Sequence, residues 1–267
     1  MDELNKIEDT LFVPMLGRIY ATEHFPNILN DQKALALKPL LPKDIKGQDT
    51  QSQYTLLAGA VRSTNMDRYI DDFITRKPNG VIVQLGLGLE TTYDRHAGNN
   101  NQWYGIDLEN VIKFRRTLLN ETDKDVFMVG DAFSEEWIQT IRKNHPTEPI
   151  LVTASGLLYY FEKEQVITLF KNLTKYGDIE VVFDTVNAKG MSQMARYMKQ
   201  VGHSDALMYF YVDDGNELAK EVGGKLLNEE PYYKHTEKKG LGFVTKATMK
   251  ISDMFMMVKM IHLDLKA

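Results

Sequence analysis

From Val81 onward, short apolar runs alternate with longer stretches that carry apolar residues at helical spacing. The first run, Val81–Val83, is β-branched and uninterrupted, which is typical of a strand buried on both faces of a parallel sheet. Four further runs predict strands of the same kind: Trp103–Ile106, Val126–Val129, Ile150–Thr153 and Ile179–Phe183. The alternation predicts an α/β fold with a doubly wound, mostly parallel sheet, whose ligand lies at the carboxyl ends of the strands.

Helical patterns lie between and before these runs. Leu108–Leu119 and Glu162–Tyr176 each place apolar side chains on one face, and Gln53–Ile74 does so ahead of the first strand. Residues 10–41 mix apolar and charged positions without a strand period. They predict short helices that form an N-terminal helical cap over the sheet.

The C-terminal part has a weaker pattern. A helix is expected near Ser192–Gln200, followed by a strand-like run at Met208–Val212, a polar turn at Asp213–Asn216 and an apolar stretch at Phe255–Leu263. We expect the two apolar segments to pair as an antiparallel hairpin that extends the sheet edge.

Length and composition favour a single domain. No linker or low-complexity block divides the 267 residues, so 1–267 is expected to be one domain, with a cap and lead-in helix over 1–78 and the sheet core over 79–267. The chain has no cysteine, which excludes disulfides and thiolate metal sites. Its 13 methionines are most simply adaptable core residues, and no metal site is expected.

Charge and hydropathy limit the partners. A formal net charge of −5 provides no overall basic field for nucleic acid or an anionic membrane, so a small-molecule substrate is favoured. The polar start is not a signal peptide, and no apolar run approaches the length of a membrane span. A cytoplasmic protein is expected, while the sequence leaves the oligomeric state open.

The candidate chemistry begins at the end of the first strand. Gly86 and Gly88 follow the strand directly, and glycine allows a backbone to pass close to a nucleotide-like ligand. Asp107 ends the next strand, where an acid can accept hydrogen bonds from a ribose. Dinucleotide sites usually carry a third glycine, but that position is Thr91. The pattern therefore favours S-adenosylmethionine, which has no phosphate, over a nicotinamide dinucleotide.

The two glycines and Asp107, and two further candidates for contact with the cofactor, Arg62 and Asp131, each have a plainer explanation. The two glycines can make only a tight turn, and Asp107 can cap the next helix. Arg62 can be a surface residue or a structural ion pair instead of a ligand for the cofactor's carboxylate. Asp131 can be a turn residue beside Gly130 instead of an adenine contact.

Several segments together resemble one known family. They are TLFVPMLGRIYATE with NDQKA, VIVQLGLGLETTYDR, WYGIDLENVIKFRRTLL, GDAFSEEWI, and ASGLLYYFEKEQV followed by VVFD. The series resembles the leucine carboxyl methyltransferase family, and in particular its bacterial and fungal branch similar to tetracenomycin-type polyketide O-methyltransferases. The resemblance covers most of the chain. It implies the class I methyltransferase fold, S-adenosylmethionine as cofactor, and methylation of oxygen.

The resemblance also implies site residues. The implied cofactor-binding residues are Arg62, Gly86, Gly88, Asp107, Leu108, Asp131, Ala132 and Ser155. Among them Arg62 would bind the methionine carboxylate, Asp107 the ribose, and Asp131 with Ala132 the adenine. The family usually has Glu where this chain has Ser155, which can hydrogen-bond the cofactor but offers no carboxylate.

The resemblance places Arg18, Tyr159 and Tyr160 near the methyl acceptor. No catalytic residue is assigned, because in-line methyl transfer needs alignment and desolvation more than a protein nucleophile. The first hypothesis is an O-methyltransferase that acts on a carboxylate or hydroxyl of a small, polyketide-like molecule. Alternatives are a protein C-terminal carboxyl methyltransferase, a non-catalytic S-adenosylmethionine-binding protein and, more distantly, a nicotinamide oxidoreductase.

Overall fold

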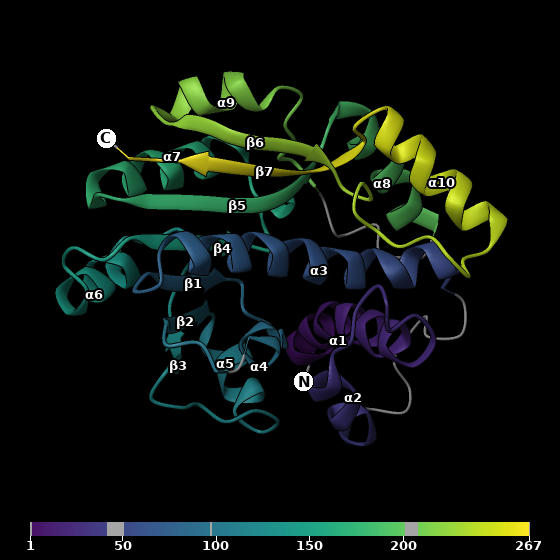
Figure 1. Cartoon of the computed structure of the whole chain (residues 1–267), viewed down its shortest axis with the longest axis horizontal. Helices are drawn as coiled ribbons and strands as arrows, with labels where there is room; N and C mark the ends of the chain where they lie inside the picture. Colours follow the sequence, from purple (N-terminus) through teal and green to yellow (C-terminus); the bar gives the residue numbers. More distant parts are fainter. Residues whose placement is uncertain (1, 42–50, 97, 201–207, 267) are drawn as a thin grey trace.

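The computed structural model describes residues 2–41, 51–96, 98–200 and 208–266. These residues form a seven-stranded sheet in the order β3-β2-β1-β4-β5-β7-β6 (Figure 1). The strands are β1 (Val81–Leu85), β2 (Gln102–Asp107), β3 (Asp125–Val129), β4 (Ile150–Ala154), β5 (Ile179–Val186), β6 (Lys225–Pro231) and β7 (Val258–Asp264).

The first five strands pair in parallel, and β7 pairs antiparallel with both β5 and β6. The predicted fold class, a doubly wound and mostly parallel sheet with an antiparallel C-terminal edge, is confirmed. The strand order reverses direction between β1 and β4, which both belong to the centre of the sheet. In sheets of this kind ligands bind outside the carboxyl ends of the strands at that reversal.

Helices cover the sheet on both sides (Figure 1). The α-helices are α1 (Asp2–His24), α2 (Gln32–Leu37), α3 (Gln53–Arg76), α4 (Thr92–Arg95), α5 (Glu109–Arg115), α6 (Glu136–Asn144), α7 (Lys163–Leu173), α8 (Ala188–Gln200), α9 (Gly215–Val222) and α10 (Phe243–Met254). Three 3₁₀ turns accompany them: η1 (Lys38–Leu40), η2 (Leu158–Tyr160) and η3 (Thr174–Tyr176).

Alternation along the strands divides the core into two layers. Val81, Val83 and Leu85 of β1 pack with apolar residues of α6, α7 and α9. Ile82, which points to the opposite face, packs with the buried stripe of α3 and with Met249 of α10. A third cluster joins α1 and α2 to the loop after β1 and to α5. This third cluster fixes the helical cap against the carboxyl end of β1.

The N-terminal segment differs from the expected series of short helices. Its first part is one helix of 23 residues, α1, while the short helix α2 agrees with the prediction. Phe12, Met15 and Ile19 are buried at helical spacing, but Pro14 lies inside the helix and obscures that pattern in the sequence. The prediction was wrong here because packing against α3 maintains the helix through the proline.

Gly17 allows α1 to lie very close to α3. A Cβ at Gly17 would be 2.4 Å from the backbone oxygen of Leu56, whereas a Cβ at Gly59 on α3 would be 3.5 Å from the Cα of Pro14, an ordinary contact. We expect Gly17→Ala to lower the free energy of unfolding by about 1–3 kcal/mol, because the two backbones must separate. Chemical denaturation measures the change. Gly59→Ala is the matched control and should be neutral or stabilising.

Equal destabilisation by Gly17→Ala and Gly59→Ala would contradict the close approach of the two helices as the cause. The comparison is direct, because both substitutions add one methyl group between the same pair of helices.

The predicted C-terminal hairpin is wrong in its first strand. Met208–Val212, although it lies in the described part of the chain, is not a strand. The backbone N–H groups of Tyr209 and Phe210 bond to the carbonyl of Tyr159, and that of Val212 bonds to Val186, so they join no ladder. Phe210 and Val212 are buried, which explains why the run is apolar. The strand that pairs with β7 at the sheet edge is instead the polar strand β6.

Two further helices were missed. The predicted polar turn at Asp213–Asn216 is the start of α9, where the Asp214 side chain accepts from the backbone N–H groups of Asn216 and Glu217. Helix α10 precedes the final strand, and β7 begins at Val258.

Within the described ranges, no helix combines the length and apolar character that crossing a bilayer requires.

Candidate functional site

A cavity of about 460 Å³ lies at the carboxyl ends of β1, β2 and β4. Its lining includes the loop after β1, the start of α5, the loop after β4, and residues of α1, α3 and α8. The predicted site residues that line it are Arg18, Arg62, Gly86, Gly88, Asp107, Leu108, Ser155, Tyr159 and Tyr160. The structure thus brings together residues that are up to 142 positions apart in the chain, from Arg18 to Tyr160.

The glycine turn requires glycine at both positions. Gly86 has φ +66° and Gly88 has φ +50°, in the left-handed region that side chains disfavour. A Cβ at Gly86 would be 2.9 Å from Cδ1 of Leu157, and one at Gly88 would be 3.2 Å from Cδ2 of Leu11. The turn therefore combines an unusual backbone conformation with close packing from two sides.

Asp107 lies at the end of β2 and holds this turn. Its Oδ2 accepts from the N–H of Gly88 at 2.7 Å, and its Oδ1 accepts from the N–H of Leu108 at 2.8 Å. Burial raises the pKa of the carboxyl, and the two backbone donors partly offset this effect. Asp107 therefore lines the cavity and holds the glycine turn, but it does not cap α5, whose N-cap residue is Leu108 and which has no side-chain cap bond.

Arg62 projects from α3 and lines the cavity next to Asp184 of β5. Its Nε donates to Oδ2 of Asp184 at 2.8 Å, and its Nη2 donates to the hydroxyl of Tyr159 at 3.3 Å. Burial by itself lowers the pKa of Arg62, but the Asp184 carboxylate outweighs it and raises the pKa. The structural ion pair and the cavity position, which were alternatives, occur together.

Arg18 is almost completely buried, although part of it lines the cavity. Its Nη1 is 3.1 Å from a carboxylate oxygen of Glu90, its Nε is 3.3 Å from Asp31, and its Nη2 donates to the backbone oxygen of Leu89 at 2.7 Å. These contacts join α1 to the loop after β1. Binding of the acceptor by Arg18 stays a prediction.

Glu90 is the centre of this ion-pair cluster. It also accepts from Nη1 of Arg95 at 3.0 Å and from the hydroxyl of Ser63 at 3.2 Å. Burial raises its pKa, but Arg18 and Arg95 outweigh burial and lower the pKa from 4.5 to about 2. Glu90 is therefore ionised over the whole range in which the folded protein is expected to function.

The low pKa of Glu90 makes stability depend on pH. Because the folded pKa is below the unfolded one, its contribution is complete above pH 4.5 and is lost as pH falls toward about 2. The shift corresponds to at most about 3 kcal/mol. We expect Glu90→Gln to have a lower Tm at pH 7 and a smaller further loss on acidification than the wild type. Glu109→Gln, which removes an exposed ion pair with Lys113 on α5, should change the pH profile of Tm far less.

A wild-type slope retained in Glu90→Gln would show that other carboxylates cause the loss. Glu180 and Glu230, whose pKa values are also lowered to about 2, are the alternatives.

The remaining predicted residues fall into two groups. Tyr159 is buried with its hydroxyl bonded to Asp184, whereas Tyr160 is 41% exposed at the cavity. Asp131 and Ala132, although both lie in the described chain, do not line the cavity. The Asp131 carboxylate accepts from the N–H of Phe133 at 2.9 Å, as in a turn. Their adenine contacts stay predictions.

Sequence reasoning missed several residues of the site. Glu90 directly follows the Gly-Leu-Gly-Leu run, and Asp184 directly follows a buried apolar run, so acids at strand ends were available as a signal. Leu11, Pro14 and Met194 close the cavity from α1 and α8. They carry no motif, since any apolar side chain at the right place could serve.

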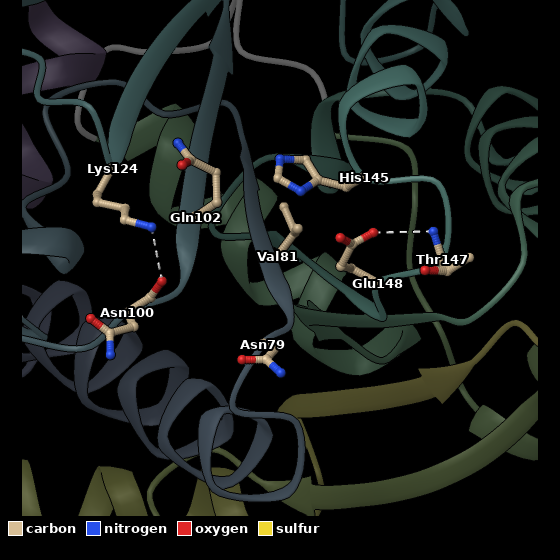
Figure 2. Close-up of a pocket in the computed structure, with 8 residues that line it drawn as sticks. All are labelled: Asn79, Val81, Asn100, Gln102, Lys124, His145, Thr147 and Glu148. Atoms are coloured by element: carbon tan, nitrogen blue, oxygen red, sulfur yellow. Dashed lines mark hydrogen bonds between the residues drawn. The ribbon is translucent and has the colours of Figure 1, made fainter.

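A second cavity of about 460 Å³ opens at the amino ends of the strands (Figure 2). Figure 2 shows Lys124, whose Nζ donates to the backbone oxygen of Asn100, and Glu148, which accepts from the N–H of Thr147. Burial lowers the pKa of His145, whose ring bonds the hydroxyl of Tyr104. These polar groups bond one another, and ligands of doubly wound sheets bind at the other end. The cavity at the carboxyl ends is therefore the candidate site.

The family profile decides the identity of the chain. The profile of the leucine carboxyl methyltransferase family matches residues 13–174, more than half of the sequence. The chain belongs to the leucine carboxyl methyltransferase family. The match includes the cap, the glycine turn, Asp107 and the loop after β4. This member of the family is thus an S-adenosylmethionine-dependent methyltransferase, and the expected enzyme class and cofactor are confirmed.

Two relatives match along most of the chain. The S-adenosyl-L-methionine-dependent methyltransferase dpfgK of Gibberella zeae is 22% identical, over 94% of this chain and 91% of the relative. The tetracenomycin polyketide synthesis O-methyltransferase TcmP of Streptomyces glaucescens is 21% identical, over 85% of this chain and 83% of the relative. The expected family and branch are confirmed.

Solved structures share the fold at low identity. A DUF574 family protein from Streptomyces avermitilis matches with a TM-score of 0.60 and 13% identity, over 94% of this chain and 97% of the other. Magnesium protoporphyrin IX methyltransferase from Synechocystis, with bound SAH, matches with a TM-score of 0.53 and 10% identity, over 82% and 90%. The class I methyltransferase fold is confirmed.

Proposed function

We propose that this methyltransferase transfers the sulfonium methyl group of S-adenosylmethionine to a carboxylate or hydroxyl oxygen of a small molecule. The observation that carries the proposal is the cavity at the carboxyl ends of β1, β2 and β4, which contains the glycine turn and Asp107 and is closed by the helical cap. The similarity to TcmP, an O-methyltransferase of tetracenomycin polyketide synthesis, supports the choice of oxygen and a polyketide-like acceptor.

The cofactor contacts follow from the lining. The turn at Gly86 and Gly88 would lie under the cofactor, Asp107 with Leu108 would receive the ribose, and Arg62 would bind the methionine carboxylate. The Ser155 hydroxyl would replace the usual carboxylate as a hydrogen-bonding group. Asp131 and Ala132, which do not line the cavity, would contact adenine from the loop after β3, a role that rests on the family resemblance alone.

The lining also favours one kind of acceptor. Leu11, Pro14 and Met194 are apolar and exclude water, which promotes transfer between an aligned sulfonium and oxygen. None of the described lining residues is a histidine, and the two lining carboxylates, Glu90 and Asp107, are both hydrogen bonded within the chain. A carboxylate acceptor needs no base, so we propose it ahead of a phenol.

The test uses S-adenosylmethionine with a labelled methyl group and matched pairs of aromatic acids and phenols. A methyl ester releases methanol in alkali, whereas an aryl methyl ether does not, so alkaline treatment of the product identifies the acceptor oxygen. We expect alkali-labile label on a small acid. The family name raises a protein carboxyl end as an alternative acceptor. Labelling of a peptide C-terminus without labelling of any small oxygen acceptor would overturn the small-molecule proposal.

A further inference from the structure

Asp184 has no exposed surface and does not itself line the cavity, but three residues that line the cavity donate hydrogen bonds to it. The residue lies near the carboxyl end of β5, next to the loop that follows β4. It accepts from Nε of Arg62 at 2.8 Å, from the backbone N–H of Gly156 at 2.7 Å, and from the hydroxyl of Tyr159. All three donors belong to residues that line the cavity. One buried carboxylate thus joins α3, the loop after β4 and η2.

The guanidinium of Arg62 is restrained on two sides. Asp184 holds its Nε, and a Cβ at Gly156 would be only 2.5 Å from its Nη1, so the glycine leaves just enough space for the group. Gly156 has φ +67°, which suits glycine. With Nε bonded to Asp184 and one N–H of Nη2 bonded to the Tyr159 hydroxyl, the second N–H of Nη2 and those of Nη1 are the ones left for a ligand.

We propose that Asp184 is a positioning residue for the cofactor: it orients Arg62 so that the terminal guanidinium nitrogens bind the methionine carboxylate. The inference rests on the proposed function of Arg62. A planar guanidinium binds a carboxylate well only in the correct orientation, and a buried acceptor that bonds Nε fixes that plane. The charge of Asp184 repels a second carboxylate, but it also offsets the burial of Arg62. Orientation is the larger effect, because binding through two nitrogens depends on geometry.

Two ligands separate this role from general damage to the cavity. S-adenosylhomocysteine carries the amino-acid arm, whereas 5′-methylthioadenosine has the same nucleoside without that arm. Calorimetry measures both affinities for the full chain. We expect Asp184→Asn to weaken the binding of S-adenosylhomocysteine about tenfold, because a charged hydrogen bond is lost, and to leave the affinity for 5′-methylthioadenosine unchanged. Arg62→Lys should show the same selectivity.

The second readout is the energetic coupling between Asp184 and Arg62, measured with a double variant. If Asp184 acts through Arg62, the double variant Asp184→Asn with Arg62→Lys should bind S-adenosylhomocysteine no more weakly than the weaker single variant. Tyr159→Phe removes one donor to Asp184 together with the direct contact between the Tyr159 hydroxyl and Nη2 of Arg62, with little change in shape. It should give a smaller selective loss, about threefold, and it tests the restraint of Arg62 if Asp184→Asn does not fold.

Glu180 provides the matched control on the same strand. It is also buried and accepts from Nη1 and Nη2 of Arg76 at 2.8 and 2.7 Å, but it lies at the other end of β5 and does not line the cavity. Glu180→Gln should lower Tm without a selective loss of affinity for S-adenosylhomocysteine relative to 5′-methylthioadenosine. The same selective loss in this variant would assign the effect to β5 as a whole and overturn the proposal.

The outcomes for Arg62 and Asp184 are distinguishable. Loss of S-adenosylhomocysteine affinity in Arg62→Lys, but not in Asp184→Asn, overturns the positioning role and leaves the proposed function of Arg62 intact. Equal loss of both ligands in Asp184→Asn also overturns it. Unchanged binding in both variants overturns the positioning role together with the assignment of Arg62 to the carboxylate, while the methyl-transfer assay tests the enzymatic function separately.

Discussion

Replacing Gly86 by valine is expected to abolish detectable cofactor binding and to leave the protein folded. Gly86 has φ +66°, and its missing Cβ would be 2.9 Å from Cδ1 of Leu157, at the floor of the cavity. A valine adds backbone strain of about 1–3 kcal/mol, and its branches fill space that the ligand needs. We expect an affinity for S-adenosylmethionine at least about a hundredfold weaker, because the branched side chain excludes the ligand, while the strain lowers stability. Calorimetry measures binding, and circular dichroism confirms the fold.

Gly98 offers the control for backbone strain alone. It has φ +102°, and nothing lies within 4 Å of its missing Cβ. Gly98→Val should therefore destabilise the turn that contains it without weakening cofactor binding. Normal binding by a folded Gly86→Val variant would show that the glycine turn has only a structural role.

The strands of the parallel sheet could be predicted because each contains a short apolar run. All residues of β1, β4 and β5 are buried, and the runs VIV, ILV and VVF stand out although the polar residues Gln84, Thr153 and Glu180 belong to the same strands. Edge strand β6 has the sequence KLLNEEP and is partly exposed, and its register shifts between Leu226 and Asn228. Its pattern therefore resembles a loop. Helix α10 was missed for a related reason: its buried positions include Thr245 and Ser252, while Phe243 is 85% exposed.

The site divides in the same way into local and long-range parts. Gly86, Gly88 and Asp107 lie within 22 residues and mark a strand, a turn and a strand end. The pair between Arg62 and Asp184 spans 122 residues, so only the fold brings the two charges together. Composition and spacing could place Arg62 on a helix, but they could not identify its partner.

Asp107 combines two functions that an alanine would remove together. Its carboxylate accepts from the N–H groups of Gly88 and Leu108, and it also lines the cavity at the end of β2. If it receives the ribose hydroxyls, a charged hydrogen-bond acceptor contributes about 1.5–3 kcal/mol to binding. The expected loss is therefore about ten- to a hundredfold in affinity.

We expect Asp107→Ala to weaken the binding of S-adenosylhomocysteine and of 5′-methylthioadenosine to the same extent, because both ligands carry the ribose. This pattern differs from the selective loss expected at Arg62 and Asp184, so one set of titrations separates the two halves of the cofactor site. Asp214→Ala is the matched control, since its carboxylate also accepts from two backbone N–H groups, at the start of α9. It should lower Tm slightly, because α9 loses its cap, and leave both affinities unchanged. Wild-type affinity in a folded Asp107→Ala protein would limit Asp107 to holding the turn.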